Sequence, residues 1–179
     1  MNSINFFTHI THIFAPTVIL LVCVLLFLTT CLYMYAKKIA VKAFFQKQGF
    51  FLLPNFVKAS YIIVKSTALT ALLVVSIKEI VKAPRPENML IIETGYAFPS
   101  GHAALAFSFF VAIAYCLYVF KQIKSGWFLL IIAALVATSR VVLHVHSLKD
   151  VVVGSLLGAL SVIVVIMYIK FHYGKYVKN

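Results

Sequence analysis

The sequence predicts an all-α protein, a bundle of about five transmembrane helices preceded by a short N-terminal interfacial helix. Of the 179 residues, 63% are hydrophobic and only 11% are charged, whereas a soluble domain carries about 25% charged residues. Apolar runs of the length needed to cross a bilayer recur along the chain. A soluble fold could not cover its surface with so few charges, so a single membrane domain over residues 1–179 is predicted.

Five apolar runs define the expected spans. They comprise residues 16–36, 60–81, 102–120, 127–144 and 151–171. Residues 1–15 are apolar and aromatic but too short for a span, so we expect an interfacial helix or a re-entrant cap there. The first run lacks the positive n-region and the cleavage site of a signal peptide, which predicts a retained span.

The basic residues predict the orientation of the bundle. The net charge is +12, and most Lys residues lie in short segments between the spans rather than on one soluble face. This distribution indicates membrane topology rather than a nucleic-acid partner. Under the positive-inside rule the cytoplasmic side carries the following residues: Lys37, Lys38, Lys42, Lys47, Lys58, Lys121, Lys124, Lys170, Lys175 and Lys178. The loops after the second and fourth spans then face outward.

Neither the cysteines nor the acidic residues indicate a metal site. Cys23, Cys31 and Cys116 lie inside apolar runs, which is typical of small core residues. Four acidic residues in the whole chain are too few for a carboxylate cage around a metal ion. We therefore expect no metal, no cofactor and no disulfide.

Polar residues gather at the outward ends of the spans, and they come from three separate chain segments. A charge at the centre of a membrane helix costs about 2.5–3.5 kcal/mol on insertion scales, and cations at one level also repel each other. An anion held between the cations would offset both costs, and phosphate is the expected anion. The residues concerned are Lys78, Arg85, Ser100, Gly101, His102, Arg140, His146 and Asp150.

Local sequence suggests how these residues would hold a phosphate. Two prolines flank Arg85 and should end the second span, which places Arg85 in the exit turn. We expect Ser100 to cap the helix that starts at Gly101, leaving backbone N–H groups free for an anion. Gly101 would let the backbone approach the ligand. Arg140 offers a planar fork for two phosphate oxygens.

Two histidines and one acid complete the predicted chemistry. His146 and Asp150 are four residues apart, so Asp150 can accept from one imidazole nitrogen and leave the other free to attack phosphorus. His102 comes from another segment and can protonate the leaving oxygen.

Three motifs in residues 78–150 resemble the signature of the type 2 phosphatidic acid phosphatase superfamily in their order and internal spacing. They are Lys78-x6-Arg85-Pro86, Pro99-Ser100-Gly101-His102 and Ser139-Arg140-x5-His146-x3-Asp150. The resemblance implies a metal-independent, all-helical enzyme that hydrolyses lipid phosphates through a phosphohistidine. It also implies residue roles: phosphate binding by Lys78, Arg85, Ser100, Gly101 and Arg140, a nucleophile at His146, its partner at Asp150 and acid–base catalysis at His102. Many membrane members have six spans and we count five, which leaves the side of substrate entry open.

Other residues in this region receive structural interpretations. The spacing to Arg140 and to Asp150 selects His146 over His144, which we interpret as a rim or packing residue. Glu79 is expected to pair with Lys82 or Lys78. The small-residue stripe Gly154-x3-Gly158 predicts close packing of the fifth span within the bundle rather than dimerisation.

Several functions stay open at this point. The first is a phosphatase at a bacterial inner membrane, facing the periplasm or the cell exterior. Its substrate would be undecaprenyl pyrophosphate, phosphatidylglycerol phosphate or a lipid A phosphate, presented from the membrane plane. The alternative is a phosphotransferase with a lipid acceptor, and a non-enzymatic lipid-phosphate binder is the third. The spans argue against a soluble vanadate-dependent haloperoxidase. The oligomeric state is open, and a monomer is compatible with the sequence.

Overall fold

Helices make up almost all of the described chain. The computed structural model describes residues 3–37, 53–121 and 123–173, and within these ranges it contains no strand. Five stretches are long and apolar enough to cross a membrane, which confirms the prediction of an all-α bundle with five spans. The elements are α1 (Ser3–Ile13), α2 (Pro16–Ala36), α5 (Asn55–Val81), α6 (Gly101–Lys121), η1 (Lys124–Phe128), α7 (Leu129–Val142) and α8 (Leu148–Tyr173).

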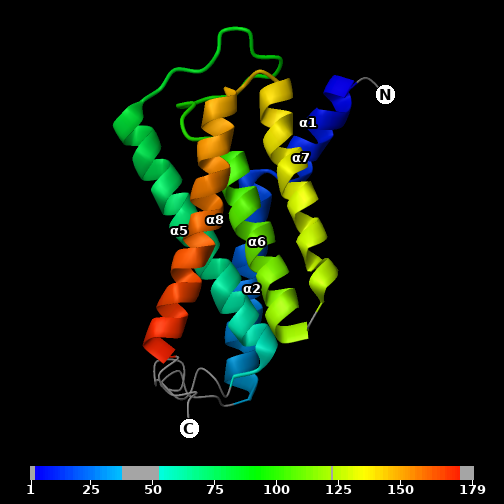
Figure 1. The fold of residues 1–179 in the computed structure, drawn as a ribbon, viewed down its shortest axis with the longest axis vertical. Coiled ribbons are helices and arrows are strands. Elements are labelled where there is room, and N and C mark those ends of the chain that lie inside the picture. The colour runs from blue at the N-terminus through cyan, green and yellow to red at the C-terminus, as the bar shows by residue number, and fades with distance from the viewer. Residues whose placement is uncertain (1–2, 38–52, 122, 174–179) are drawn as a thin grey trace.

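The first apolar stretch, Ile4–Ala36, contains both α1 and α2. Pro16 opens α2, a position where its missing N–H costs no helical hydrogen bond. Helix α1 lies beside the C-terminal end of α7 (Figure 1), where the hydroxyls of Thr11 and Ser139 are 2.8 Å apart and buried. A helix at the N-terminus is thus confirmed, while its depth in the bilayer stays a prediction.

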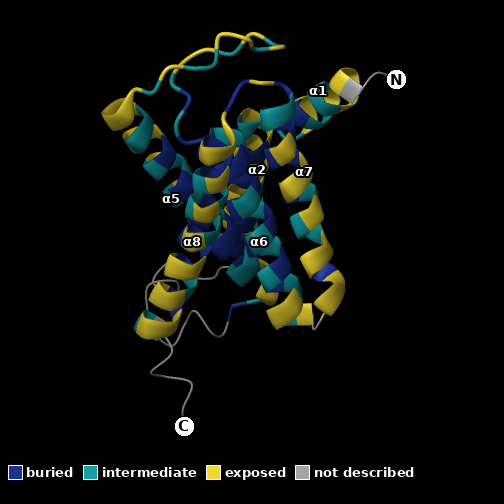
Figure 2. Cartoon of the chain, turned by 45° about the horizontal axis from the view of Figure 1, so that its top comes forward, coloured by how far each residue is buried: buried dark blue, intermediate teal, exposed yellow. Residues whose placement is uncertain are grey.

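Helix α6 is the centre of the bundle. It packs against α2, α5, α7, η1 and α8. Buried residues concentrate in the middle of the molecule, whereas the sides of α7 and α8 that point away from the bundle carry many exposed residues (Figure 2). These exposed faces are largely apolar, as a surface in contact with lipid requires. Small residues let the neighbours of α6 approach closely, and those completely buried on it are Ala103, Ala104, Ala106, Ser108, Ala112 and Ala114.

Two glycines bring α8 into contact with α6. A Cβ on Gly154 would lie 2.5 Å from the backbone oxygen of Ser100. A Cβ on Gly158 would collide with the backbone oxygen of Ala104 and lie 2.9 Å from the backbone nitrogen of Ser108. The obstructing atoms are backbone atoms of α6, which a side-chain rotation cannot move. The predicted packing role of this stripe is confirmed.

Replacing Gly158 by alanine is therefore expected to destabilise the bundle. Overpacking of this kind costs about 1–3 kcal/mol, and thermal unfolding in detergent, followed by circular dichroism, should show a lower Tm. Gly101→Ala is the matched control, because a Cβ there meets only Val74 Cγ1 at 3.6 Å. Equal Tm values for the two variants would contradict the proposed packing.

Candidate active site

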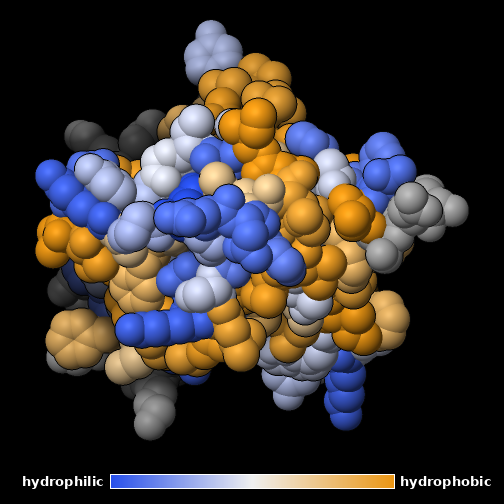
Figure 3. Space-filling view, turned by 90° about the horizontal axis from the view of Figure 1, so that it is seen from above, coloured by the Kyte–Doolittle hydropathy of each residue, from blue (hydrophilic) through white to orange (hydrophobic). Residues whose placement is uncertain are grey.

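The connection of residues 82–100 crosses the end of the bundle where α5 and α7 end and α6 and α8 begin (Figure 1). Hydrophilic side chains gather on this end among hydrophobic ones (Figure 3). Helix α5 stops at Val81, and Lys82 follows in the left-handed conformation with φ 49°. Arg85 lies in the exit turn, as predicted.

Three backbone carbonyls fix the Arg85 guanidinium. Its Nε donates to Gly95 over 3.0 Å, its Nη2 to Thr94 over 2.9 Å, and its Nη1 to Val145 over 3.1 Å. The first two bonds fold the connection back on itself, and the third ties it to the turn between α7 and α8. Arg85 is thereby presented in one orientation.

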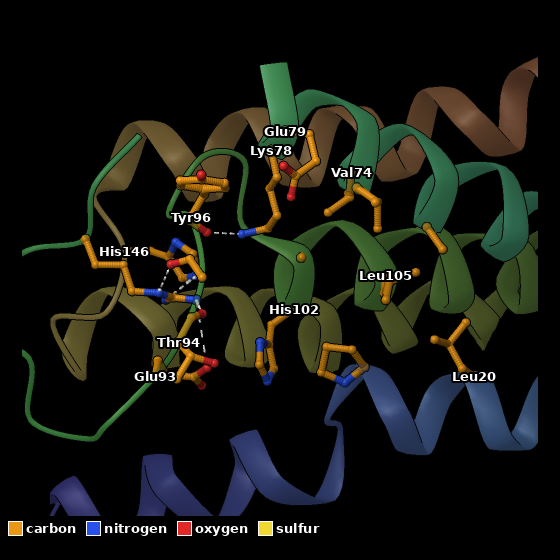
Figure 4. Close-up of a pocket in the computed structure, with 16 residues that line it drawn as sticks. Leu20, Val74, Lys78, Glu79, Glu93, Thr94, Tyr96, His102, Leu105 and His146 are labelled. Atoms are coloured by element: carbon orange, nitrogen blue, oxygen red, sulfur yellow. Dashed lines mark hydrogen bonds and ion pairs between the residues drawn. The ribbon is translucent and has the colours of Figure 1, made fainter. Parts of the chain in front are cut away.

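A cavity of about 440 Å³ lies beneath this connection, and Figure 4 shows the side chains around it. The predicted site residues that line it are Lys78, Arg85, Gly101, His102 and His146. The other three, Ser100, Arg140 and Asp150, are buried and do not line it. One side of the cavity is apolar and is formed by Pro16, Leu20, Ala71, Val74, Val75 and Leu105. The cavity therefore joins a polar end to an apolar side.

His146 lies in the turn between α7 and α8 and is only 3% exposed. Its Nε2 is 3.3 Å from Arg85 Nη1. A guanidinium has no acceptor, so Nε2 accepts this bond and the ring hydrogen resides on Nδ1. Nδ1 is 3.7 Å from Asp150 Oδ2, which is too long for a hydrogen bond. The structure therefore places the two residues together but does not form the predicted bond.

The Asp150 carboxylate has another partner, which explains that distance. Its Oδ2 accepts from the backbone N–H of Ser147 over 2.8 Å, while the Asp150 N–H donates to Ser147 Oγ over 3.2 Å. This reciprocal capping box begins α8. Asp150 thus fixes the first turn of α8 and faces His146 from there.

His146 is held in its neutral form. Burial is the largest cause, and the positive charges of Arg85, Arg140 and Lys78 add to it, which together lower the pKa of His146 to about 3. The ordinary value is near 6.5, so at pH 7 the imidazole keeps a lone pair on Nε2. Such a nitrogen can attack an electrophile.

Arg140 is completely buried at the end of α7 and meets an unexpected partner. Its Nη2 donates to Oε1 of Glu93, and Glu93 Oε2 lies 3.9 Å from Arg85 Nη2. Within the described residues, Arg140 Nε and Nη1 have no hydrogen-bond partner. Glu93 is not among the residues that the sequence predicts for the site. The sequence feature that could have indicated Glu93 is its position between two of the motifs, since the chain has only four acidic residues.

The structure corrects the prediction for Ser100. Its Oγ is buried and has no hydrogen-bond partner in the described ranges, so this side chain does not cap α6. The residue is instead held by its backbone. Its N–H donates to the Asp150 carbonyl over 3.0 Å, and its carbonyl accepts from Ala104 over 3.0 Å. The close approach of Gly154 adds to this contact with α8.

The prediction for Glu79 is also wrong. Glu79 is exposed, lines the cavity, and has no ion pair with Lys78 or Lys82 in the part of the chain that is described. The reason is that the Lys78 ammonium turns away and donates to the backbone carbonyl of Tyr96. Lys78 therefore helps to hold the connection over the cavity.

His102 and His144, the two other histidines in this part of the chain, differ in their position relative to the cavity. His102 lies in the first turn of α6 and faces the cavity shared with Lys78 and His146 (Figure 4). His144 is exposed, does not line this cavity, and has Nδ1 3.1 Å from Asn88 Nδ2. Its position fits the rim interpretation. A neutral imidazole, a second histidine and nearby cations are suited to binding and attacking a phosphate.

A family comparison agrees with this geometry. Residues 59–173 match the model of the PAP2 superfamily, which is more than half of the chain. The chain belongs to the PAP2 superfamily. The predicted family is thus confirmed, and the matched range includes all three PAP2 motifs.

Known proteins resemble the chain in sequence or in fold. The bacitracin transport permease protein BcrC of Bacillus licheniformis is 37% identical over 82 residues, which cover 46% of this chain but only 38% of that protein. The PAP2 type phosphatidylglycerolphosphate phosphatase of Bacillus subtilis superposes with a TM-score of 0.69 and 27% identity, covering 92% of this chain and 75% of that one. Aquifex aeolicus LpxE superposes with a TM-score of 0.63 and 25% identity, covering 92% of this chain and 86% of that one.

Proposed function

We propose that this protein is a membrane phosphatase that hydrolyses a lipid phosphomonoester or pyrophosphate through a phosphohistidine on His146. The observation that carries the proposal is the buried imidazole of His146, whose Nε2 lies 3.3 Å from Arg85 Nη1 at the wall of a cavity that Lys78 and Arg85 also line. Membership of the PAP2 superfamily and similarity to a phosphatidylglycerolphosphate phosphatase support it.

The proposed reaction has two half-steps. His146 Nε2 attacks phosphorus, the bond to the lipid oxygen breaks, and His102 gives that oxygen a proton. Water then attacks the phosphohistidine, with His102 taking its proton, and phosphate leaves. Asp150 would stabilise the positive charge that develops on the imidazole. Arg85 Nη1 would give up its hydrogen bond to His146 Nε2 and donate to a phosphate oxygen instead.

The apolar side of the cavity supports a substrate that arrives within the membrane. Val75 lines the cavity and is also 60% exposed, so the cavity reaches the lipid-facing surface beside α5. Leu20, Val74 and Leu105 continue this wall between α2, α5 and α6. A hydrocarbon chain could lie here while its head group reaches His146.

The assay uses the purified full-length chain with a panel of lipid phosphates. The panel contains undecaprenyl pyrophosphate, phosphatidylglycerol phosphate and a lipid A phosphate. Release of free phosphate without an added acceptor, unaffected by EDTA and inhibited by vanadate, is the expected result. A phosphorylated acceptor lipid would establish the alternative, a phosphotransferase. A folded protein that processes no member of the panel would contradict both.

The outward orientation is a separate part of the proposal. Its support is the distribution of lysines between the spans. A Glu87→Cys variant in intact cells should react with a membrane-impermeant thiol reagent, because residue 87 is exposed on the connection above the site. Labelling only after the membrane is opened would place the site on the cytoplasmic side.

A further inference from the structure

The Glu93 carboxylate occupies the position where two arginines converge. One oxygen accepts from Arg140 Nη2, and the other lies 3.9 Å from Arg85 Nη2. Two oxygens of one anion thus face two guanidiniums, which is the arrangement that phosphate would adopt between them. The resting site already contains an anion, and this anion belongs to the chain itself.

Glu93 also stands between the cavity and Arg140. Its side chain is 24% exposed and lines the cavity, whereas Arg140 is completely buried and does not. A phosphate that enters the cavity meets the carboxylate before it can reach Arg140. A contact between phosphate and Arg140 Nη2 therefore requires that Glu93 leave.

Only the side chain of Glu93 needs to move. On one side of it, the Leu90 N–H donates to the Leu143 carbonyl over 3.1 Å. On the other, Arg85 holds the carbonyls of Thr94 and Gly95. These bonds fix the backbone at both flanks, and the partial exposure of the carboxylate gives it a path toward solvent.

We propose that Glu93 is an internal competitor that sets the phosphate affinity of the site, an inference that rests on the proposed function. A phosphomonoester dianion carries more charge than a carboxylate, and a lipid substrate gains further binding from its chain in the apolar part of the cavity. Inorganic phosphate lacks that chain. Return of Glu93 to Arg140 therefore displaces the phosphate product and limits product inhibition.

A different role would give the opposite result. If Glu93 served only to position the Arg140 guanidinium, its removal would weaken phosphate binding. If it competes with phosphate, its removal strengthens binding, because one negative charge at the site is lost. The direction of the change therefore separates the two roles.

The test compares Glu93→Gln with Glu87→Gln in the full-length protein. Glu87 is the matched control, since it is exposed on the same connection and has no ion pair among the described residues. Binding of inorganic phosphate and orthovanadate is measured by calorimetry without lipid. Glu93→Gln should bind both roughly tenfold more tightly, equivalent to about 1.4 kcal/mol, and Glu87→Gln should not change.

Lipid turnover supplies the second measurement. With Glu93→Gln, both KM and the inhibition constant for phosphate should fall, and kcat should fall where product release is limiting. Unchanged or weaker phosphate binding in a folded Glu93→Gln variant would overturn the inference. Phosphate binding without hydrolysis of any lipid would contradict the proposed function alone. Absence of phosphate and vanadate binding in both proteins would overturn both.

Discussion

Replacing His146 by asparagine is expected to lower kcat/KM for a lipid phosphate by at least roughly 10³-fold, because an amide cannot form the phosphohistidine. His146 is buried and lines the cavity, and its Nε2 lies 3.3 Å from Arg85 Nη1. The variant should still insert and fold, since α7 and α8 do not depend on this side chain for their helical bonds. Phosphate release and thermal unfolding in detergent measure the two properties separately.

His144→Asn is the matched control for this experiment. His144 lies two residues away, is exposed, and has φ 55°, a conformation that asparagine tolerates well. Most of the activity should remain, because His144 does not line the cavity. A comparable loss in both variants would show that the turn as a whole, rather than one imidazole, is required.

The second large effect is expected for Arg140→Lys. The charge is kept, but a lysine cannot hold two oxygens in one plane, so kcat/KM should fall by roughly 10²–10³-fold. The fold should persist, since the carbonyl of residue 140 still accepts from the N–H groups of Val145 and His146. Steady-state kinetics with a lipid phosphate tests this expectation.

Lys82→Asn controls for long-range attraction of the anionic head group. Lys82 is an exposed cation at the same end of the bundle, and its φ of 49° also suits asparagine. A small, salt-dependent change in KM is expected. If this variant lost as much activity as Arg140→Lys, direct contact between Arg140 and phosphate would not be the reason for the loss.

The spans were predictable because a chain segment inside a bilayer can adopt few structures other than a helix. Every backbone polar group inside a bilayer must be paired within the helix, so the length of an apolar run nearly fixes the element. The run of residues 16–36 matches α2 (Pro16–Ala36) at both ends. The runs at 127–144 and 151–171 begin next to polar residues, where the structure adds η1 (Lys124–Phe128) and the capping box of Ser147 and Asp150.

The convergence of the site was also predictable, but its detailed contacts were not. Helices of similar length bring their ends to one level, so Lys78, His102 and His146 had to meet near one end of the bundle. The contact between Glu93 and Arg140 joins residues 47 positions apart and depends on how the connection folds back over the cavity. The free Ser100 hydroxyl depends on the contact of its backbone with α8.

The central claim is that His146 carries the phosphoryl group during turnover. Mixing the protein with a ³²P-labelled lipid phosphate and quenching it in alkali within one turnover tests this directly. We expect label on His146, stable in alkali and lost in acid, and no label in His146→Asn. Turnover with no labelled protein, or with label on a different residue, would contradict it.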